Sequence, residues 1–146
     1  MKLMKRMYRG AASDAGFTLL ELLVVLAILG LLAAIVAPRF ISYLGSSRTK
    51  TAAVQVKNIA TSLELYRLDA GHYPNDQEGL QALVKAPPGV VAWNGPYLAD
   101  KAALTDPWGR PYHYASPGKH GEFDIFSYGA DGQEGGSGED KDVGNW

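Results

Sequence analysis

Two places in this sequence hold carboxylates that could do chemistry. The segment 129–146 reads GADGQEGGSGEDKDVGNW and carries five acids: Asp131, Glu134, Glu139, Asp140 and Asp142. Calcium takes about six to eight oxygen ligands from carboxylates, backbone carbonyls and water. Interleaved glycines let a backbone fold tightly and turn its carbonyls inward. Composition alone therefore leaves two alternatives, a calcium-binding loop or a solvated, disordered acidic tail.

The acidic segment does not match an EF-hand, although Asp131 to Asp142 spans twelve residues with Gly136 in sixth place. An EF-hand uses oxygen ligands at its third and fifth positions and a Glu at its last. Gln133 and Gly135 occupy the third and fifth positions here, the last is Asp, and no helical pattern flanks the segment. A calcium site in this segment would be a loop of another kind.

The second place is Glu21, a single acid within a long apolar run. Residues 17–37 read FTLLELLVVLAILGLLAAIVA, which as a helix at about 1.5 Å per residue spans about 31 Å, close to the thickness of a bilayer core. A charge inside a membrane is costly, less so near the interface. Glu21 is therefore either an interfacial acid or a carboxylate with a partner. A cut before Phe17 would free an α-amino group that could pair with Glu21 of an adjacent subunit.

The flanks of the apolar run indicate its orientation. The run is apolar on every side and follows four basic residues: Lys2, Lys5, Arg6 and Arg9. This asymmetry predicts a cytoplasmic N-terminus, with the bulk of the chain on the other side of the membrane. A removable signal peptide would have a shorter apolar region and a small-residue cleavage site after it. A plain, unprocessed single-span anchor is the other alternative.

Beyond the apolar run, an amphipathic pattern predicts that the helix continues. Leu65 and Leu68 widen its apolar side, and Gly71 marks its end. We expect a near-continuous helix over about 18–68, bent near Pro38 or Gly45. Its core-facing residues recur every three or four positions: Ala52, Val56, Ile59, Leu63 and Tyr66.

From residue 71 onward, Gly, Pro and aromatic residues become frequent and helical periodicity stops. Alternation in the last predicted strand places Asp124 on the face opposite Ile125. The segment beginning Asp106-Pro107-Trp108-Gly109 predicts a hairpin whose Trp covers the core. Short elements are expected along this part: a helix over 78–85 and strands over 96–98, 112–114 and 122–128.

Several function classes find no support in the composition. The chain has no cysteine, which excludes disulfides, zinc thiolates and cysteine nucleophiles. Its net charge of −1 implies no general affinity for nucleic acid. No H-E-x-x-H, G-x-S-x-G or Walker loop occurs, and His72, His113 and His120 are scattered. We therefore expect neither an enzyme nor a nucleic-acid partner.

The junction Gly16-Phe17-Thr18-Leu19-Leu20-Glu21 resembles the processing site of type IV pilin-like proteins, in which a basic leader ends in Gly and Glu is the fifth mature residue. The D-P-W-G segment and the C-terminal G-A-D-G…D-V-G-N-W resemble those of type II secretion major pseudopilins. The resemblance covers nearly the whole chain. It implies an α+β pilin-like fold, in which a long N-terminal helix packs on a small antiparallel sheet with a calcium-binding C-terminal loop.

This resemblance also implies a division of the chain into four parts. A prepilin leader, 1–16, is cleaved, and 17–37 is the transmembrane or fibre-core half of the helix. Residues 38–70 form its amphipathic half. A periplasmic globular part, 71–146, ends in the acidic loop 129–146.

The resemblance further implies cleavage between Gly16 and Phe17 by a prepilin peptidase, N-methylation of Phe17, and a role for Glu21 in assembly. The mature subunit would polymerise from the bacterial inner membrane into a periplasmic pseudopilus that drives export of folded proteins across the outer membrane. Minor pseudopilins, an inner-membrane assembly platform and its ATPase are the implied partners. Two alternatives stay open: a type IV pilin for adhesion, motility or DNA uptake, and a calcium-binding exported module with a simple anchor.

Within the C-terminal loop, the resemblance implies Asp131 and Asp142 as side-chain calcium ligands, with the backbone carbonyls of Tyr128 and Gln133. Asp140 is a further candidate, because the spacing before the final Asp varies in the family. Calcium would then be the staple that a small domain without disulfides needs. It would stabilise only the folded loop, by mass action.

Overall fold

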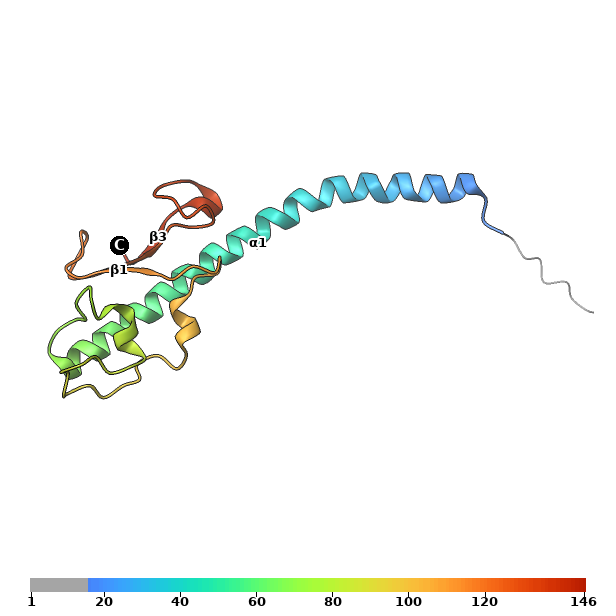
Figure 1. The fold of residues 1–146 in the computed structure, drawn as a ribbon. Helices are drawn as coiled ribbons and strands as arrows, with labels where there is room; N and C mark the ends of the chain where they lie inside the picture. The colour runs from blue at the N-terminus through green and yellow to red at the C-terminus, as the bar shows by residue number, and fades with distance from the viewer. Residues whose placement is uncertain (1–15) are drawn as a thin grey trace, which may run out of the picture. The chain divides into compact units, whose positions relative to one another are not determined.

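The computed structural model describes residues 16–146, apart from the side chain of Ser42 (Figure 1). It divides between Arg39 and Phe40 into two compact units, each described by itself below. Helix precedes sheet along the chain, as expected for an α+β fold. The elements are α1 (Leu19–Ala70), the 3-10 helices η1 (Gly79–Leu83) and η2 (Lys101–Leu104), β1 (His113–Ala115), β2 (Asp124–Ser127), the 3-10 helix η3 (Gly138–Asp140) and β3 (Val143–Gly144).

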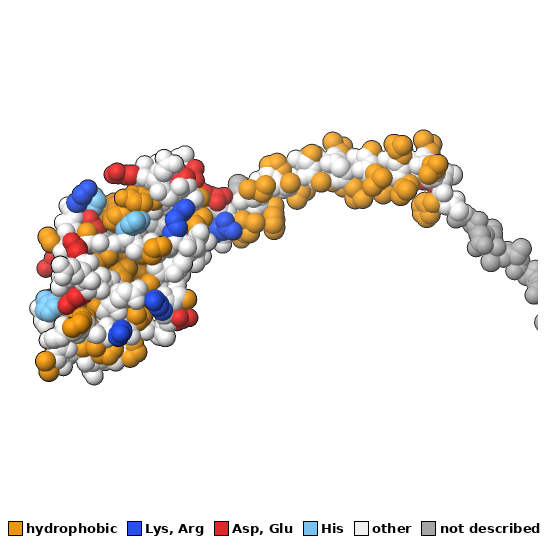
Figure 2. All heavy atoms as spheres, in the orientation of Figure 1, with side chains coloured by type: hydrophobic (Ala, Val, Ile, Leu, Met, Phe, Trp, Pro, Cys, Tyr) orange, Lys and Arg blue, Asp and Glu red, His pale blue; other side chains and the backbone are white. Residues whose placement is uncertain are grey.

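In the first unit, α1 is apolar and its side chains are exposed. Figure 2 shows hydrophobic side chains along the visible face of this part of the helix. The most apolar stretch of α1 is not buried anywhere along its length, and α1 is long and apolar enough to cross a membrane. An apolar surface of this extent is rare on soluble monomers and marks a membrane or helix-packing segment. Pro38 lies inside the helix without ending it.

In the second unit, the C-terminal half of α1 buries one narrow stripe. The residues predicted to face the core do so: Ala52, Val56, Ile59, Leu63 and Tyr66. Leu65 and Leu68 do not widen that stripe, because they are 48% and 72% exposed. Each helical residue advances by about 100°, which turns both leucines away from the buried face. The helix ends as predicted at Gly71, which has φ +82° and donates its N–H to the carbonyl of Arg67 at 2.8 Å.

A three-stranded antiparallel sheet, in the order β1-β2-β3, packs on this helix (Figure 1). Tyr114 pairs with Ile125 between the first two strands, and Ser127 pairs with Val143 between the last two. The core lies where the sheet, η1 and η2 meet the buried stripe of α1. Its largest fully buried side chains from outside α1 include Leu83 and Ile125.

Two predicted elements need correction. The strand expected over 96–98 is irregular, because Tyr97 and Leu98 both donate their N–H groups to the carbonyl of Leu83, at 2.8 and 3.3 Å, instead of to a neighbouring strand. Pro96 lacks an N–H, which removes one donor that a strand would need. The helix expected over 78–85 is a shorter 3-10 helix, η1.

Asp124 is the clearest departure from strand alternation. It is 3% exposed, although alternation places it on the strand face opposite the fully buried Ile125. Its carboxylate accepts the N–H groups of Lys119 at 2.8 Å and His120 at 3.2 Å, and it contacts His120 Nδ1 at 3.0 Å. Burial raises the pKa of this carboxyl, but these donors outweigh it and hold the pKa below its ordinary value. The loop between β1 and β2 therefore folds over Asp124.

Candidate functional site

The first candidate site is the start of α1, where Thr18 and Glu21 form a reciprocal cap. Glu21 Oε2 accepts from the N–H and from the hydroxyl of Thr18, each at 3.0 Å. The N–H of Glu21 donates in return to Thr18 Oγ1 at 3.1 Å. This is a capping box, which satisfies backbone donors that the first turn of a helix leaves free. Sequence reasoning missed it, although the T-x-x-E spacing that signals it is present.

The predicted processing junction lies immediately before this cap. Gly16 and Phe17 precede the first residue of α1, and Phe17 is 85% exposed. A side chain added at Gly16 would meet nothing within 4 Å. The remainder of the predicted leader, 1–15, lies outside the described residues. Both described residues of the predicted junction are therefore exposed.

The second candidate site is the acidic loop predicted over 129–146. Its part between β2 and β3, residues 128–142, is called the acidic loop from here on. Its two arms meet at the base, where Ala130 donates its N–H to the carbonyl of Glu139 at 2.9 Å. Gly129 and Gly136 approach the backbone of Asp140 so closely that an added Cβ would lie within 2.7 Å of it. The acidic segment is therefore a folded loop, and a disordered tail is not what the chain forms.

Two carboxylates point into the turns of this loop. Asp131 Oδ1 accepts the N–H of Gln133 at 3.0 Å, and Asp142 Oδ2 accepts the N–H of Gly135 at 2.9 Å. The other oxygen, Asp142 Oδ1, is buried and has no hydrogen-bond partner within residues 16–146. A buried carboxylate oxygen without a donor is costly. A cation is the natural group to satisfy it, so the loop fits a hard metal ion.

The other predicted ligands lie around these two carboxylates. Asp140 lies in η3, and its N–H donates to the carbonyl of Ser137 at 3.2 Å. Tyr128 leads into the loop. The centroid of its ring lies 4.8 Å from that of His113 and 5.1 Å from that of Phe126. No group of three or more His, Asp or Glu side chains suited to a metal occurs in the described part of the chain. A metal in this loop would therefore depend on backbone carbonyls as well as on carboxylates.

The D-P-W-G turn supports the base of the acidic loop, a role that sequence reasoning did not assign. Asp106 is 5% exposed and accepts the N–H groups of Trp108 at 3.0 Å and Arg110 at 2.8 Å. Arg110 Nη2 donates to the carbonyls of Gly129 and Ala130, the latter at 2.9 Å. Trp108 packs at the edge of the core, as predicted for this hairpin. No periodicity in the sequence signals the Arg110 contact, because it joins residues about twenty positions apart.

The far side of the acidic loop rests on α1. A Cβ at Gly45 would lie 1.5 Å from Glu139 Oε1, so the Glu139 side chain occupies the space that any other residue at position 45 would fill. Gly is otherwise unfavourable inside a helix. At Gly45, one of the two positions where a bend is predicted, the structure shows a close approach by the Glu139 side chain.

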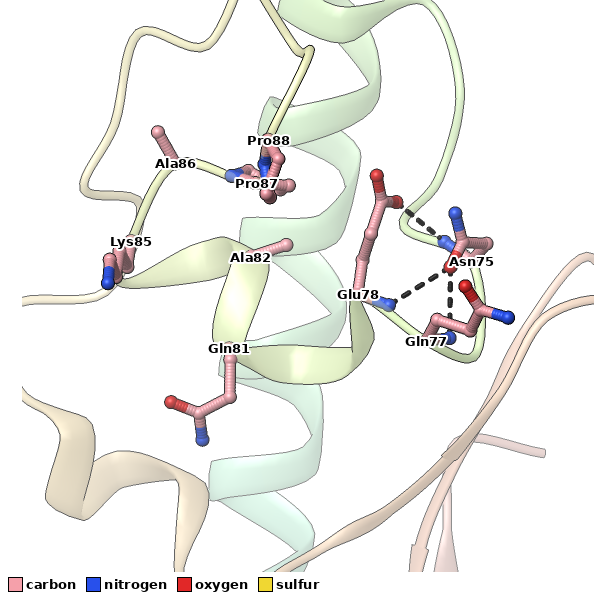
Figure 3. A pocket seen from close by; sticks show the side chains of 9 residues that line it. All are labelled: Asn75, Gln77, Glu78, Gln81, Ala82, Lys85, Ala86, Pro87 and Pro88. Carbon is pink, nitrogen blue, oxygen red and sulfur yellow. Dashed lines mark hydrogen bonds between the residues drawn. The ribbon is translucent and has the colours of Figure 1, made fainter.

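A cleft of about 550 Å³ beside η1 carries no evident chemistry (Figure 3). Glu78 Oε2 accepts the N–H of Asn75 at 2.9 Å, and Asn75 Oδ1 accepts the N–H groups of Gln77 and Glu78. These polar groups stabilise the turn before η1. Lys85 and apolar or amide side chains complete the lining, which includes no His, Ser or Tyr. The cleft does not supply a nucleophile with a base.

Comparison with known proteins places these features in a family. Residues 39–146 match the family model described as type II secretion system, protein G. Residues 12–37 match the prokaryotic N-terminal methylation motif, which spans the Gly16–Phe17 junction and Glu21. The two matches meet near the boundary between the two compact units.

Individual relatives agree with both matches. The type II secretion system core protein G of Pseudomonas aeruginosa is 47% identical, over 91% of this chain and 95% of its own length. That of Vibrio cholerae is 42% identical, over 91% and 92%. The crystal structure of the major pseudopilin from the type 2 secretion system of enterohaemorrhagic Escherichia coli covers 68% of this chain and 87% of its own, at 31% identity and a TM-score of 0.56. The chain therefore belongs to the type II secretion system protein G family.

Proposed function

We propose that this chain is the major structural subunit of the pseudopilus of a type II protein secretion system and acts by assembly, not by catalysis. One observation carries the proposal: the exposed apolar N-terminal part of α1, long enough to cross a membrane, is joined to a folded unit of the protein G family. Such a helix is stable in lipid or packed against other helices. A subunit that leaves a membrane to enter a fibre needs both environments.

Before assembly, the apolar part of α1 spans the bacterial inner membrane once. The basic residues ahead of it favour a cytoplasmic N-terminus, which puts the second unit in the periplasm. Because the chain has no cysteine, a single Cys introduced at the exposed Ser137 reports its own location. A membrane-impermeant maleimide should label it in intact spheroplasts. Labelling that requires lysis would mean that the orientation is the reverse.

Maturation consists of cleavage between Gly16 and Phe17 by a prepilin peptidase, followed by N-methylation of Phe17. The methylation-motif match and the exposure of the junction support this step. Intact mass and N-terminal analysis of protein from membranes should give methyl-Phe17 as the first residue. Gly16→Ala should impair leader removal on an immunoblot, and a native protein that still begins at Met1 would exclude processing.

During assembly, the freed amine of Phe17 pairs with the Glu21 carboxylate of an adjacent subunit. Both charges then lie among apolar side chains, where mutual pairing is the means of neutralising them. Further subunits extend the homopolymer, with minor pseudopilins, an inner-membrane platform and its ATPase as partners. In the single chain, Thr18 already holds one oxygen of Glu21, so the fibre contact must share or displace that cap.

Three variants separate the cap from the charge pair. Glu21→Gln keeps an oxygen that can accept from Thr18 but removes the charge, whereas Thr18→Ala keeps the charge and removes the hydroxyl of the cap. We expect Glu21→Gln and Glu21→Ala to insert in the membrane and fail to assemble, and Thr18→Ala to assemble. Fibre yield after shearing measures this. Wild-type fibres from Glu21→Gln would eliminate the charge pair.

We further propose that the acidic loop binds one calcium ion. Asp142 would contribute its buried, unpartnered Oδ1, and Asp131 a second carboxylate. The carbonyls of Tyr128 and Gln133, with water, would add oxygens, and Asp140 is a further candidate. Five acids and one base give residues 129–146 a net charge of −4. A bound divalent cation would offset part of that charge and stabilise the folded loop.

Calcium-dependent melting of the full-length protein in detergent tests the site. Calcium at about a hundred times its Kd should stabilise the fold by about 2.7 kcal/mol. Asp131→Ala combined with Asp142→Ala should abolish that shift. Glu134→Ala is the matched control, because it removes an exposed acid of the same loop. An equal loss in Glu134→Ala, or no shift in the wild type, would contradict the assignment.

A further inference from the structure

We propose that Arg110 is a positioning residue that closes the base of the acidic loop without metal and aims Asp131 at the calcium site. The metal-dependent half of this inference rests on the calcium site proposed above, whereas the closure of the base does not. Arg110 lies outside the loop, at the end of the turn that begins at Asp106.

Arg110 contacts the loop on both sides of Asp131. Before it, Arg110 Nη2 donates to the carbonyls of Gly129 and Ala130, at 2.9 Å for the second. After it, the chain passes so close that a Cβ at Gly132 would lie 3.0 Å from Arg110 Nη1. Gly132 has φ +71°, a conformation that also favours glycine. The guanidinium therefore fixes the backbone on either side of the carboxylate.

These contacts also decide which carbonyls a metal can use. An oxygen that accepts from a guanidinium and faces its full positive charge is a poor ligand for a cation. The carbonyls of Gly129 and Ala130 are therefore withdrawn from the metal shell. Carbonyl ligands must come from outside that pair, which agrees with the positions 128 and 133 proposed above.

The backbone of Arg110, from which the guanidinium reaches the loop, is itself held by Asp106. Its N–H donates to Asp106 Oδ1 at 2.8 Å, and its carbonyl accepts the N–H of Asp106 at 2.7 Å. The other oxygen of Asp106 accepts the hydroxyl of Ser127, which in turn accepts the N–H of Gly129 at 3.3 Å. The turn is therefore linked to the loop base by two sets of hydrogen bonds, one through Arg110 and one through Ser127.

Removing Arg110 has two opposite effects on calcium affinity. Loss of the backbone contacts disorders Asp131, and the loss of such supporting partners lowers metal affinity about 10- to 100-fold. Loss of the positive charge relieves repulsion of the metal, but on an exposed loop water and salt screen this effect to a few-fold. We expect disorder to win, so affinity falls.

Hydrogen exchange and calcium titration of the full-length protein in detergent test the inference. With excess chelator, Arg110→Gln should speed exchange of the Ala130 amide, which donates to Glu139, at least tenfold, while buried-face amides of α1 stay protected. Calorimetry should show the drop in calcium affinity. Arg110→Lys keeps the charge without the planar fork and should change both in the same direction. The control is Lys141→Gln, which removes an exposed cation of the loop itself. It should neither speed exchange of the Ala130 amide nor lower the calcium affinity.

The two parts of the inference, closure of the loop base by Arg110 and orientation of Asp131 toward calcium, can be refuted separately. Wild-type exchange and wild-type affinity in both Arg110 variants would overturn the inference, and so would equal effects from Lys141→Gln. A wild type that does not bind calcium would remove the metal site. Faster exchange in Arg110→Gln under chelator would still support closure of the base by Arg110. If Arg110→Gln speeds exchange throughout α1, the variant is unfolding as a whole, and exchange and calcium affinity in Arg110→Lys then test the inference in its place.

Discussion

The carboxylate of Asp106 holds the turn that supports the acidic loop, and we expect its removal to lower the stability of the whole second unit. Its oxygens accept three hydrogen bonds, from the N–H groups of Trp108 and Arg110 and from the hydroxyl of Ser127 at 2.5 Å. Asp106→Ala removes all three acceptors. Asp106→Asn keeps Oδ1 for the two N–H groups but puts an amide N–H donor in place of the oxygen that accepts from Ser127, so the Ser127 hydroxyl loses its acceptor.

These contacts set the expected cost of each change. A hydrogen bond to a charged group contributes about 1.5–3 kcal/mol, and a buried donor left without a partner costs about 1–3 kcal/mol. Deleting a buried charge also removes its desolvation cost, so the terms do not simply add. We expect Asp106→Ala to destabilise the fold by about 3–5 kcal/mol. Asp106→Asn should cost about 1–2 kcal/mol, because one of its three contacts is lost.

Thermal melting of the full-length protein in detergent, with chelator present, measures this difference. Asp106→Ala should lower the melting temperature by on the order of 15 °C, given about 4 °C or more per kcal/mol for a unit of this size. The matched control is Asp100→Ala, because Asp100 is exposed and accepts one local N–H, that of Ala102 at 2.9 Å. It should shift the midpoint by only a few degrees.

Two results would refute this reasoning. A cost below about 1 kcal/mol for Asp106→Ala would mean that the carboxylate does not hold the turn, since each of its bonds alone should exceed that value. Equal costs for Asp106→Asn and Asp106→Ala would mean that the charge matters and the acceptor geometry does not. Either outcome would also weaken the route from this turn to the acidic loop.

Three further predictions concern stability. The lowered pKa of Asp124 contributes stability that is present above about pH 4 and is lost as the pH falls through the folded-state pKa, so Asp124→Asn should flatten the loss of melting temperature in acid. Leu63→Ala should cost about 2–5 kcal/mol in denaturant unfolding, whereas Leu68→Ala, on the exposed face of the same helix, should stay within about 0.5 kcal/mol. Gly45→Ala should stabilise the Glu139→Ala variant by about 1 kcal/mol, because Ala has the higher helix propensity. It should not stabilise the parent protein, in which the Glu139 side chain fills the space beside residue 45. Equal effects in both proteins would mean that this contact is absent.

Local patterns were enough to predict the helix and its buried stripe. Three-to-four spacing identified the core positions from Ala52 to Tyr66, because helical geometry alone places such residues on one face. Alternation located β2 within one or two residues. The apolar run and the Gly16–Phe17 junction likewise depend only on consecutive residue types. The same applies to the T-x-x-E cap, which could have been read from the sequence and was missed.

The residues that define the acidic loop depended on contacts between distant parts of the chain. Composition left a disordered tail and a calcium loop equally open, and it said nothing of Arg110 at the base or of Gly45 beneath Glu139, a residue 94 positions away. Asp124 is buried because a neighbouring loop folds over it and supplies donors, which strand alternation cannot foresee. The sequence by itself determined the elements, because short-range sterics and periodicity govern them. The tertiary structure decided which polar groups are buried and paired, because that depends on which surfaces meet.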